Sequence, residues 1–160
     1  GDTIMVDSTT DNRTFVMVKP DGVHRGLVGE ILKRFEQRGY KLVALKMLSP
    51  EKSHFEKHYA DLAQKKFFPG LISYMLTGPV VATVWEGSQA TKVGRMIVGE
   101  TDPVQSLPGT IRGDYCIEKG RNIIHASDSP QSAENEIKLW FEEKEINSWK
   151  KVDESMIYEI

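Results

Sequence analysis

The chain has 160 residues and a mass of 18.1 kDa, which is the length of one ordinary domain and too short for two with separate cores. Its 21 Lys and Arg against 23 Asp and Glu give a net charge of -2, which argues against a generic nucleic-acid or membrane-surface binder. A local basic pocket is compatible with that balance. The single cysteine, Cys116, excludes an intramolecular disulfide and a cysteine-cluster metal site, and it indicates a reducing compartment.

The first twelve residues, Gly1–Asn12, are polar and lack the basic and apolar segments of a secretory signal. We expect a disordered leader here, with residues 1–4 as a cloning remnant before a native Met5. A single domain is then expected over residues 13–160. No apolar run reaches the roughly 18 residues that a membrane span requires, so we expect a cytoplasmic protein with no membrane partner.

Apolar residues recur at strand and helix spacings along the rest of the chain. Strands are predicted at Thr14–Lys19, Tyr40–Leu48, Val80–Trp85 and Asn122–His125. Helices are predicted at Leu27–Arg38, Ser49–Tyr59, from Pro69 to about Thr77, at Ser88–Val98 and from Asp128 to about Phe141. Pro20-Asp21-Gly22 is typical of a turn. The tail holds Trp149, Ile157 and Tyr158, so we expect it to pack on the domain or on a neighbouring subunit.

The segment Gly99–Gly120 is rich in glycine and shows no periodicity, which predicts a long functional loop before the last strand. The element order is β-α-β, two short helices, β-α, a long loop and β-α. Interpreted as a repeated split βαβ unit, this order gives an α+β, ferredoxin-like βαββαβ fold with a four-stranded antiparallel sheet covered by helices. A doubly wound parallel sheet is the alternative, and periodicity alone does not choose between the two.

His125 is the first candidate for chemistry, because it ends an apolar strand and is followed by small polar residues. A core histidine bonded to a backbone carbonyl is the competing interpretation. Glu136 falls on the flank of the buried face of the next helix. A carboxylate bonded to one imidazole nitrogen leaves the other nitrogen free as nucleophile or base. Ser127, two residues after the histidine, can support that bond.

Three cations and two neutral donors form a second group. Taken singly, each is more commonly a solvated charge or a turn residue. Together with a histidine at a strand end they suit a polyphosphate, because cationic side chains bind phosphate oxygens and neutralise the charge of phosphoryl transfer. The five are Lys19, Arg95, Thr101, Arg112 and Asn122. Neither a P-loop nor a dinucleotide glycine fingerprint is present, so side chains would hold any nucleotide.

Phe67 and Phe68 lie at a helix boundary, where one or both can belong to the core and an exposed ring can stack on a nucleobase. His54 and His58 have helical i, i+4 spacing but no glutamate in the H-E-x-x-H arrangement, so we interpret them as a solvated helix face. Cys116 is interpreted as an incidental loop thiol.

Several segments closely resemble nucleoside diphosphate kinases, in register from about Arg13 to Glu159. The segment around the histidine is highly specific to that family. The segments are Lys19-Pro20-Asp21-Gly22, Gly78-Pro79-Val80, Gly99-Glu100-Thr101, Pro108-Gly109-Thr110-Ile111-Arg112-Gly113-Asp114 and Asn122-Ile123-Ile124-His125-Ala126-Ser127-Asp128-Ser129.

The resemblance implies a ferredoxin-like fold and a ping-pong exchange of the γ-phosphoryl group through phosphohistidine at His125. It implies that Glu136 orients the imidazole, with Tyr59 and Ser127 in support. The remaining implied roles are phosphate binding by Lys19, Arg95, Thr101 and Arg112, sugar binding by Lys19 and Asn122, and base stacking on Phe67. Mg²⁺ would lie on the phosphates, with Asp128 reaching it through water. Members are usually hexamers, and Pro103 falls in a loop important to their assembly.

One position departs from the family pattern, which has glycine immediately after the histidine where this chain has Ala126. If that position needs a positive φ, alanine is strained by about 1–2 kcal/mol, and otherwise the change is neutral. A catalytically idle relative that binds nucleotide or protein is the rival function, and a small-ligand sensor on the same fold is a second. An idle relative has no reason to keep His125, Glu136, Arg112 and Lys19 together, and a sensor would not need the polyphosphate cations.

Overall fold

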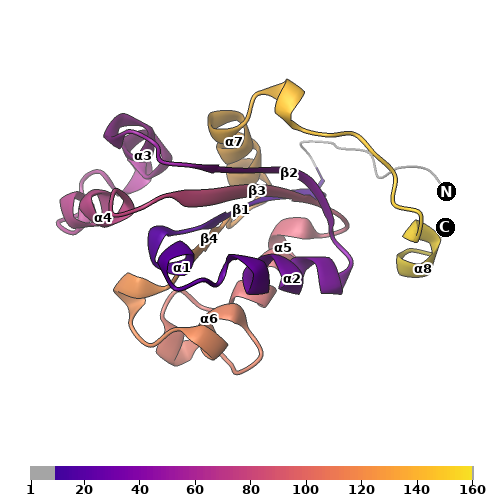
Figure 1. The fold of residues 1–160 in the computed structure, drawn as a ribbon, viewed down its shortest axis with the longest axis horizontal. Helices are drawn as coiled ribbons and strands as arrows, with labels where there is room; N and C mark the ends of the chain where they lie inside the picture. The colour runs from indigo at the N-terminus through magenta and orange to yellow at the C-terminus, as the bar shows by residue number, and fades with distance from the viewer. Residues whose placement is uncertain (1–9, 160) are drawn as a thin grey trace.

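The computed structural model describes residues 10–159 (Figure 1), so most of the predicted leader, with the predicted cloning remnant at residues 1–4, lies outside the described residues. Its four strands are β1 (Arg13–Val18), β2 (Lys41–Leu48), β3 (Val80–Glu86) and β4 (Ile124–Ala126). They form one sheet in the order β2-β3-β1-β4, and every neighbouring pair is antiparallel. The predicted ferredoxin-like α+β fold is therefore confirmed, and the doubly wound parallel alternative is wrong.

Eight α-helices connect and cover the described strands. They are α1 (Pro20–His24), α2 (Val28–Arg38), α3 (Lys52–His58), α4 (Phe68–Met75), α5 (Ala90–Val98), α6 (Ile111–Tyr115), α7 (Pro130–Trp140) and α8 (Glu154–Ile157). The starts and stops follow local chemistry. The Ser129 hydroxyl accepts a hydrogen bond from the Ser132 N–H at the start of α7, and α2 ends at Gly39 with a φ of 109°.

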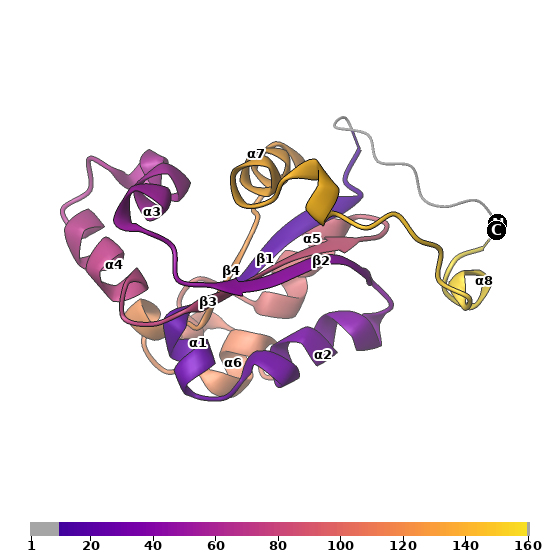
Figure 2. The ribbon, with the colours of Figure 1, turned by 45° about the horizontal axis from the view of Figure 1, so that its top comes forward.

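The sheet has a hydrophobic core on each face. Alternate residues of β1 point to opposite sides, so Phe15 packs with α3, α4 and α7, whereas Val16 packs with α2, α5 and α6. In Figure 2, α3 and α7 lie above the sheet and α2 and α6 lie below it. Because both faces are covered, β3 is buried along its whole length, and apolar residues occupy most of its positions on both faces rather than alternating with polar ones.

Two segments predicted to be irregular are helical. Pro20-Asp21-Gly22 opens α1, because the fixed φ of proline suits the first position of a helix as well as a turn. The segment 99–120 contains α6, where the Thr110 hydroxyl accepts a hydrogen bond from the Gly113 N–H at 3.0 Å. The long loop predicted before the last strand therefore contains a short helix that the lack of periodicity did not predict.

The end of the predicted leader belongs to the fold. The carboxylate of Asp11 accepts hydrogen bonds from the N–H groups of Thr91 (2.7 Å) and Lys92 (3.1 Å), which opens α5, and Asn12 is buried. Residues 11 and 12, at the end of the predicted leader, therefore bond to the rest of the domain. Asp11 caps the start of α5, and Asn12 follows it directly before β1.

The tail after α7 packs on its own domain. The Trp149 indole N–H donates to the carbonyl of Leu42 (2.9 Å), and the backbone N–H of Ser88 donates to the Tyr158 hydroxyl (3.0 Å). Trp149 nevertheless keeps 45% of its surface exposed. None of the helices in the described part of the chain is long and apolar enough to cross a membrane.

Candidate active site

The His125 imidazole is held at one nitrogen by a carboxylate. His125 lies in β4 opposite Met17 of β1, and its Nε2 is 2.9 Å from Oε1 of Glu136 on α7. A carboxylate only accepts hydrogen bonds at neutral pH, so the proton of this bond belongs to Nε2. Nδ1 therefore carries the free lone pair, as a nucleophilic or basic histidine requires.

Ser127 anchors the same carboxylate. Its hydroxyl donates to Oε1 of Glu136 at 2.7 Å and accepts, at 3.3 Å, from the N–H of Phe15 in β1. Because Ser127 is fully buried, these contacts hold the carboxylate at a fixed distance from the sheet. The structure therefore brings His125, Ser127 and Glu136 together.

His58 lies against His125, so its assignment to a solvated helix face was wrong. The two rings are perpendicular with centroids 4.6 Å apart, and the Trp140 indole donates to Nδ1 of His58 at 2.9 Å. Burial, followed by the charge of His125, lowers the pKa of His58 to about 2, so His58 is neutral at physiological pH. His54 is also half-buried, with its ring 4.3 Å from that of Trp140. No local pattern reveals these contacts, because Trp140 is 82 residues from His58.

One group of described residues has metal-ligand types within reach of one another, with ligand atoms of His58, His125 and Glu136 within 4.8 Å. Their hydrogen bonds already determine which nitrogens carry protons. A metal on the Nε2 of His58 would move the proton to Nδ1, where it would meet the indole donor of Trp140. We therefore assign no metal directly to these side chains.

Three cations surround the residues before and after β4. Lys19 donates to Oδ1 of Asn122 at 2.8 Å. Burial, followed by the charge of Arg112, lowers the pKa of Lys19 to about 8. Burial, followed by the charge of Arg95, lowers the pKa of Arg112 to about 10. Clustered cations that lower the pKa values of one another favour a bound anion, and phosphate matches the geometry of arginine.

Arg112 also holds backbone oxygens. It donates through Nε to Asn122 (3.3 Å), through Nη1 to Glu100 (3.3 Å) and through Nη2 to Ile124 (2.6 Å). A guanidinium has five N–H groups, so about two are left for a ligand. Arg95 likewise donates to the carbonyl of Ala126 at 3.1 Å, next to the histidine.

The two neutral donors contact each other. Asn122 is 5% exposed, and its amide nitrogen donates to the carbonyl of Thr101 at 3.1 Å. Thr101 itself is exposed at the surface. The structure thus brings Lys19, Asn122 and Thr101 into one chain of contacts.

The two aromatic candidates differ in exposure. Tyr59 is buried with its ring 6.4 Å from that of His125, and burial, followed by the charge of Glu136, raises its pKa, so the phenol keeps its proton. Phe67 immediately precedes α4 and is 54% exposed, whereas Phe68 packs against the core. Phe67 is therefore the ring available for stacking. Asp128 is exposed at the turn between β4 and α7.

The departure at Ala126 brings no strain. Ala126 is a regular residue of β4, and among the described residues the non-glycines with positive φ are Gln89 and Ile123. The unusual backbone is therefore at Ile123, before the histidine rather than after it. Sequence reasoning missed this position, because an isoleucine in an apolar run indicates an ordinary strand residue.

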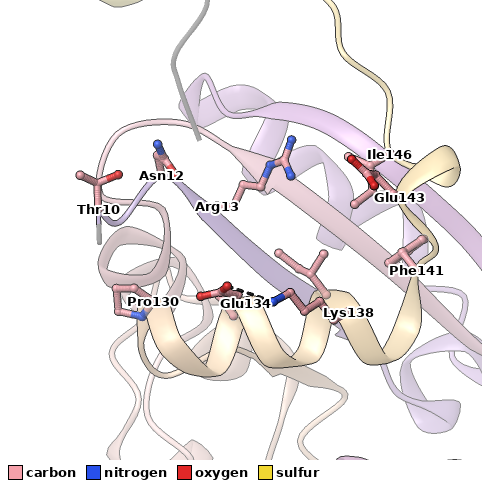
Figure 3. Close-up of a pocket in the computed structure, with 11 residues that line it drawn as sticks. Thr10, Asn12, Arg13, Pro130, Glu134, Lys138, Phe141, Glu143 and Ile146 are labelled. Carbon is pink, nitrogen blue, oxygen red and sulfur yellow. Dashed lines mark hydrogen bonds and ion pairs between the residues drawn. The ribbon is translucent and has the colours of Figure 1, made fainter. Parts of the chain in front are cut away.

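A cavity of about 410 Å³ lies elsewhere, between α7 and the start of β1 (Figure 3). Its cations are already neutralised, because Arg13 pairs with Glu86 at 3.0 Å and Lys138 pairs with Glu134 at 3.1 Å. Most of the remaining lining is apolar, including Ile137 and Phe141, and Glu143 adds a negative charge. This cavity does not suit a polyphosphate.

Comparisons with known proteins agree with this arrangement. The family model described as nucleoside diphosphate kinase matches residues 12–146. A nucleoside diphosphate kinase of Drosophila yakuba is 61% identical over 92% of this chain and 98% of its own. Nucleoside diphosphate kinase B of Homo sapiens is 58% identical over 92% and 97%.

Solved structures give the same result. That of a halophilic nucleoside diphosphate kinase from Halobacterium salinarum in complex with CDP has a TM-score of 0.90 and 45% identity, over 92% of this chain and 99% of the other. A family member from Babesia bovis has a TM-score of 0.89 and 47% identity, over 91% and 99%.

A ferredoxin-like domain with a carboxylate-bound histidine beside clustered cations defines a class, the nucleotide-handling phosphotransferases. Within that class, the chain belongs to the nucleoside diphosphate kinase family. It is an enzyme that transfers the γ-phosphoryl group of a nucleoside triphosphate to a nucleoside diphosphate, and the idle alternative is not favoured.

Proposed function

We propose that the phosphoryl group passes through His125. Nδ1 attacks the γ-phosphorus of the donor, the bond to the β,γ-bridging oxygen breaks, and the nucleoside diphosphate leaves with the bond's electrons. Phosphohistidine then carries its proton on Nε2. This N–H donates a hydrogen bond to Glu136, 2.9 Å away, and the carboxylate supports the positive charge of the ring. A terminal phosphate oxygen of a second diphosphate attacks the same phosphorus and restores the imidazole, giving a ping-pong cycle. The free Nδ1 is the observation that carries this proposal.

The surrounding residues have roles in binding. Lys19, Arg95, Thr101 and Arg112 hold phosphates, Lys19 and Asn122 hold the sugar hydroxyl, and Tyr59 and Ser127 support the catalytic pair. The lowered pKa values of Lys19 and Arg112 support this assignment, since burial and then a neighbouring cation cause both shifts. Phe67 stacks on the base and accepts any base, because every base has a π-face.

As a kinase of this family, the enzyme uses a divalent cation, which we propose to be Mg²⁺. The cationic side chains around His125 repel a metal, so the ion would lie on the phosphates, with the exposed carboxylate of Asp128 reaching it through water. When bound, Mg²⁺ neutralises charge on the transferred group.

Assembly, domain extent and location are also proposals. A single domain over residues 13–160 is supported by the tail, which bonds to β2 through Trp149. A homo-oligomer, a hexamer as the family resemblance implies, is supported by the exposure of Leu45 (52%) and Met47 (62%) on the edge strand β2. A cytoplasmic location is supported by the single free Cys116.

The test of the nucleophile is incubation with γ-labelled ATP, followed by acid or base treatment of the denatured enzyme. We expect label that is lost in acid and survives base, as a phosphoramidate does, and no label in His125→Ala despite retained nucleotide binding. His24→Ala is the matched control, since His24 is an exposed histidine that contacts the Thr77 carbonyl. Acid-stable label, or label in His125→Ala, would show that another group is phosphorylated.

A further inference from the structure

The backbone makes a strained turn just before the strand that carries the histidine. Ile123 has a φ of 58°, and the N–H of Ile124 donates to the carbonyl of Asn122 at 2.7 Å. An i→i+2 hydrogen bond with a positive φ defines a γ-turn of the rare, strained kind, and a β-branched residue is especially unfavourable there. The turn lies between two predicted functional residues, Asn122 and His125.

Lys19 and Asp21, at the start of α1, hold both backbone groups of Ile123. Oδ2 of Asp21 accepts the N–H of Ile123 at 3.1 Å, and the N–H of Lys19 donates to the carbonyl of Ile123 at 2.8 Å. Gly22 permits the approach, because a Cβ there would lie 2.9 Å from that carbonyl oxygen. The side chain of Ile123 is fully buried, so the turn is fixed on every side. Such strain persists only when its surroundings determine it.

The carboxylate of Asp21 is itself held in place. Its Oδ1 accepts the hydroxyl of Tyr74 from α4. Burial, followed by this hydrogen bond, raises the pKa of Tyr74, so the phenol keeps the proton that it donates. The guanidinium of Arg121 lies 4.5 Å from the centre of the Tyr74 ring. Three segments, α1, α4 and the residues before β4, therefore meet at one carboxylate.

We propose that Asp21 is a positioning residue for phosphoryl transfer. The Asp21 carboxylate holds the N–H of Ile123 in the γ-turn. This turn determines the orientation of the Asn122 side chain and the position of His125 on β4. Both oxygens of the carboxylate bond within the protein, so Asp21 acts through these neighbours and not on the nucleotide. The inference rests on the proposed role of His125 as nucleophile. A displacement of about 1 Å at a reacting group can slow a reaction about 100-fold.

The experiment measures phosphorylation of the enzyme in a single turnover at saturating γ-labelled ATP, together with the Kd for ADP. Asp21→Ala should slow phosphorylation about 100-fold with a much smaller change in Kd. Asp21→Asn should stay within about ten-fold of wild type, because its amide oxygen still accepts from Ile123 and its amide nitrogen can donate to Tyr74. Tyr74→Phe should slow the step by about three- to ten-fold.

The matched control is Asp11→Ala, which also removes a carboxylate bonded to backbone N–H groups, at Thr91 and Lys92, but far from the turn. It should lower the melting temperature and leave the phosphorylation rate of the folded enzyme unchanged. If Asp21→Ala does not fold, the Asn and Phe variants decide. A wild-type phosphorylation rate in Tyr74→Phe overturns the positioning role. A rate slowed about 100-fold in Asp21→Asn also overturns it, because the effect would then belong to the charge of Asp21. Failure of the wild type to form acid-labile label would instead refute the proposed function.

Discussion

Glu136 shows how a single oxygen can organise a nucleophile. Oε1 accepts from both the Nε2–H of His125 (2.9 Å) and the hydroxyl of Ser127 (2.7 Å), so the carboxylate fixes both the tautomer and the orientation of the ring. Glu136→Gln keeps the shape but loses the charge that supports a phosphorylated imidazole. We expect phosphorylation to slow by about 10²–10⁴-fold without stopping, measured in single turnovers.

The alternative outcomes are distinct. A Gln variant with no detectable phosphorylation would mean that the carboxylate does more than orient the ring and support its charge. An unchanged rate would mean that Ser127 and the packing of His58 hold the imidazole without it. Binding of nucleotide to the variant, measured by calorimetry, serves as the control.

Lys19 gives the site a dependence on pH. Its pKa is lowered to about 8, by burial and then by Arg112, so the side chain is charged below this pH and neutral above it. We expect kcat/KM to fall as the pH rises through about 8, because the free enzyme loses a phosphate ligand. Lys19→Arg should abolish this decline, since a guanidinium stays charged over the range.

The stability of the fold changes with pH in the opposite direction to kcat/KM, so the two effects of Lys19 can be separated. The folded chain binds the Lys19 proton less tightly than the unfolded chain, so this group increases stability as the pH rises above about 8 towards its ordinary value of 10.5. A melting temperature that holds or rises to about pH 9 while kcat/KM falls would therefore assign the decline to deprotonation. Identical pH profiles in wild type and Lys19→Arg would assign it to a different group.

At the scale of single elements, β4 accommodates Ala126, the residue that departs from the family pattern of glycine. Ala126 is 1% exposed, and its methyl group packs in the core beneath α5. Ala126→Gly should leave kcat within about two-fold and lower the free energy of unfolding by about 1–2 kcal/mol, from the lost methyl contact and the added freedom of glycine. Urea unfolding beside steady-state kinetics measures both. A clear gain in kcat would show that the alanine holds β4 away from its best geometry.

Helix α4 presents the proposed stacking ring at its start. Phe67→Ala should weaken binding of purine and pyrimidine nucleotides alike, by about 1–3 kcal/mol, because a stacking surface has no hydrogen-bond code. Phe67 is 54% exposed, so the change should cost little stability. Calorimetry with the four common diphosphates tests this. A loss confined to one base class would make Phe67 a specificity element instead.

The regular elements were largely predictable from the sequence, because their apolar periods are long and their ends carry clear signals. The helix predicted at Leu27–Arg38 is α2, and the one predicted at Ser88–Val98 is α5, with ends that differ by one or two residues. Helix α6 was missed, because five residues with a glycine at the centre give no period, and its start depends on the hydroxyl of Thr110.

The site was predictable only in part. The sequence places His125 and Glu136 eleven residues apart on a strand and the following helix, and such a spacing lets local patterns pair them. The contact of His58 with Trp140 and that of Asp21 with Ile123 span 82 and 102 residues. Tertiary packing alone determines these contacts, so neither appears in a period or a motif.

At the scale of the whole molecule, the open edge of β2 predicts assembly. Leu45 and Met47 are more than half exposed there, whereas the tail covers the edge at Leu42. We expect light scattering to give about six times the 18.1 kDa of the chain, and Met47→Lys to lower the mass, because a charge on an edge strand opposes pairing. A monomer at micromolar concentration in the wild type would refute the oligomer.

The pairing of β4 with β1 links catalysis to global stability. β4 has only three residues, and the N–H of Ser127 just beyond it donates to the carbonyl of Phe15 at 3.0 Å, on the strand that lies between two cores. The amide of Ser127 should therefore exchange with solvent only when β1 opens, which requires both cores to separate. Heating should then remove activity and structure in one transition, and the enzyme should pass through no folded but inactive state on the way.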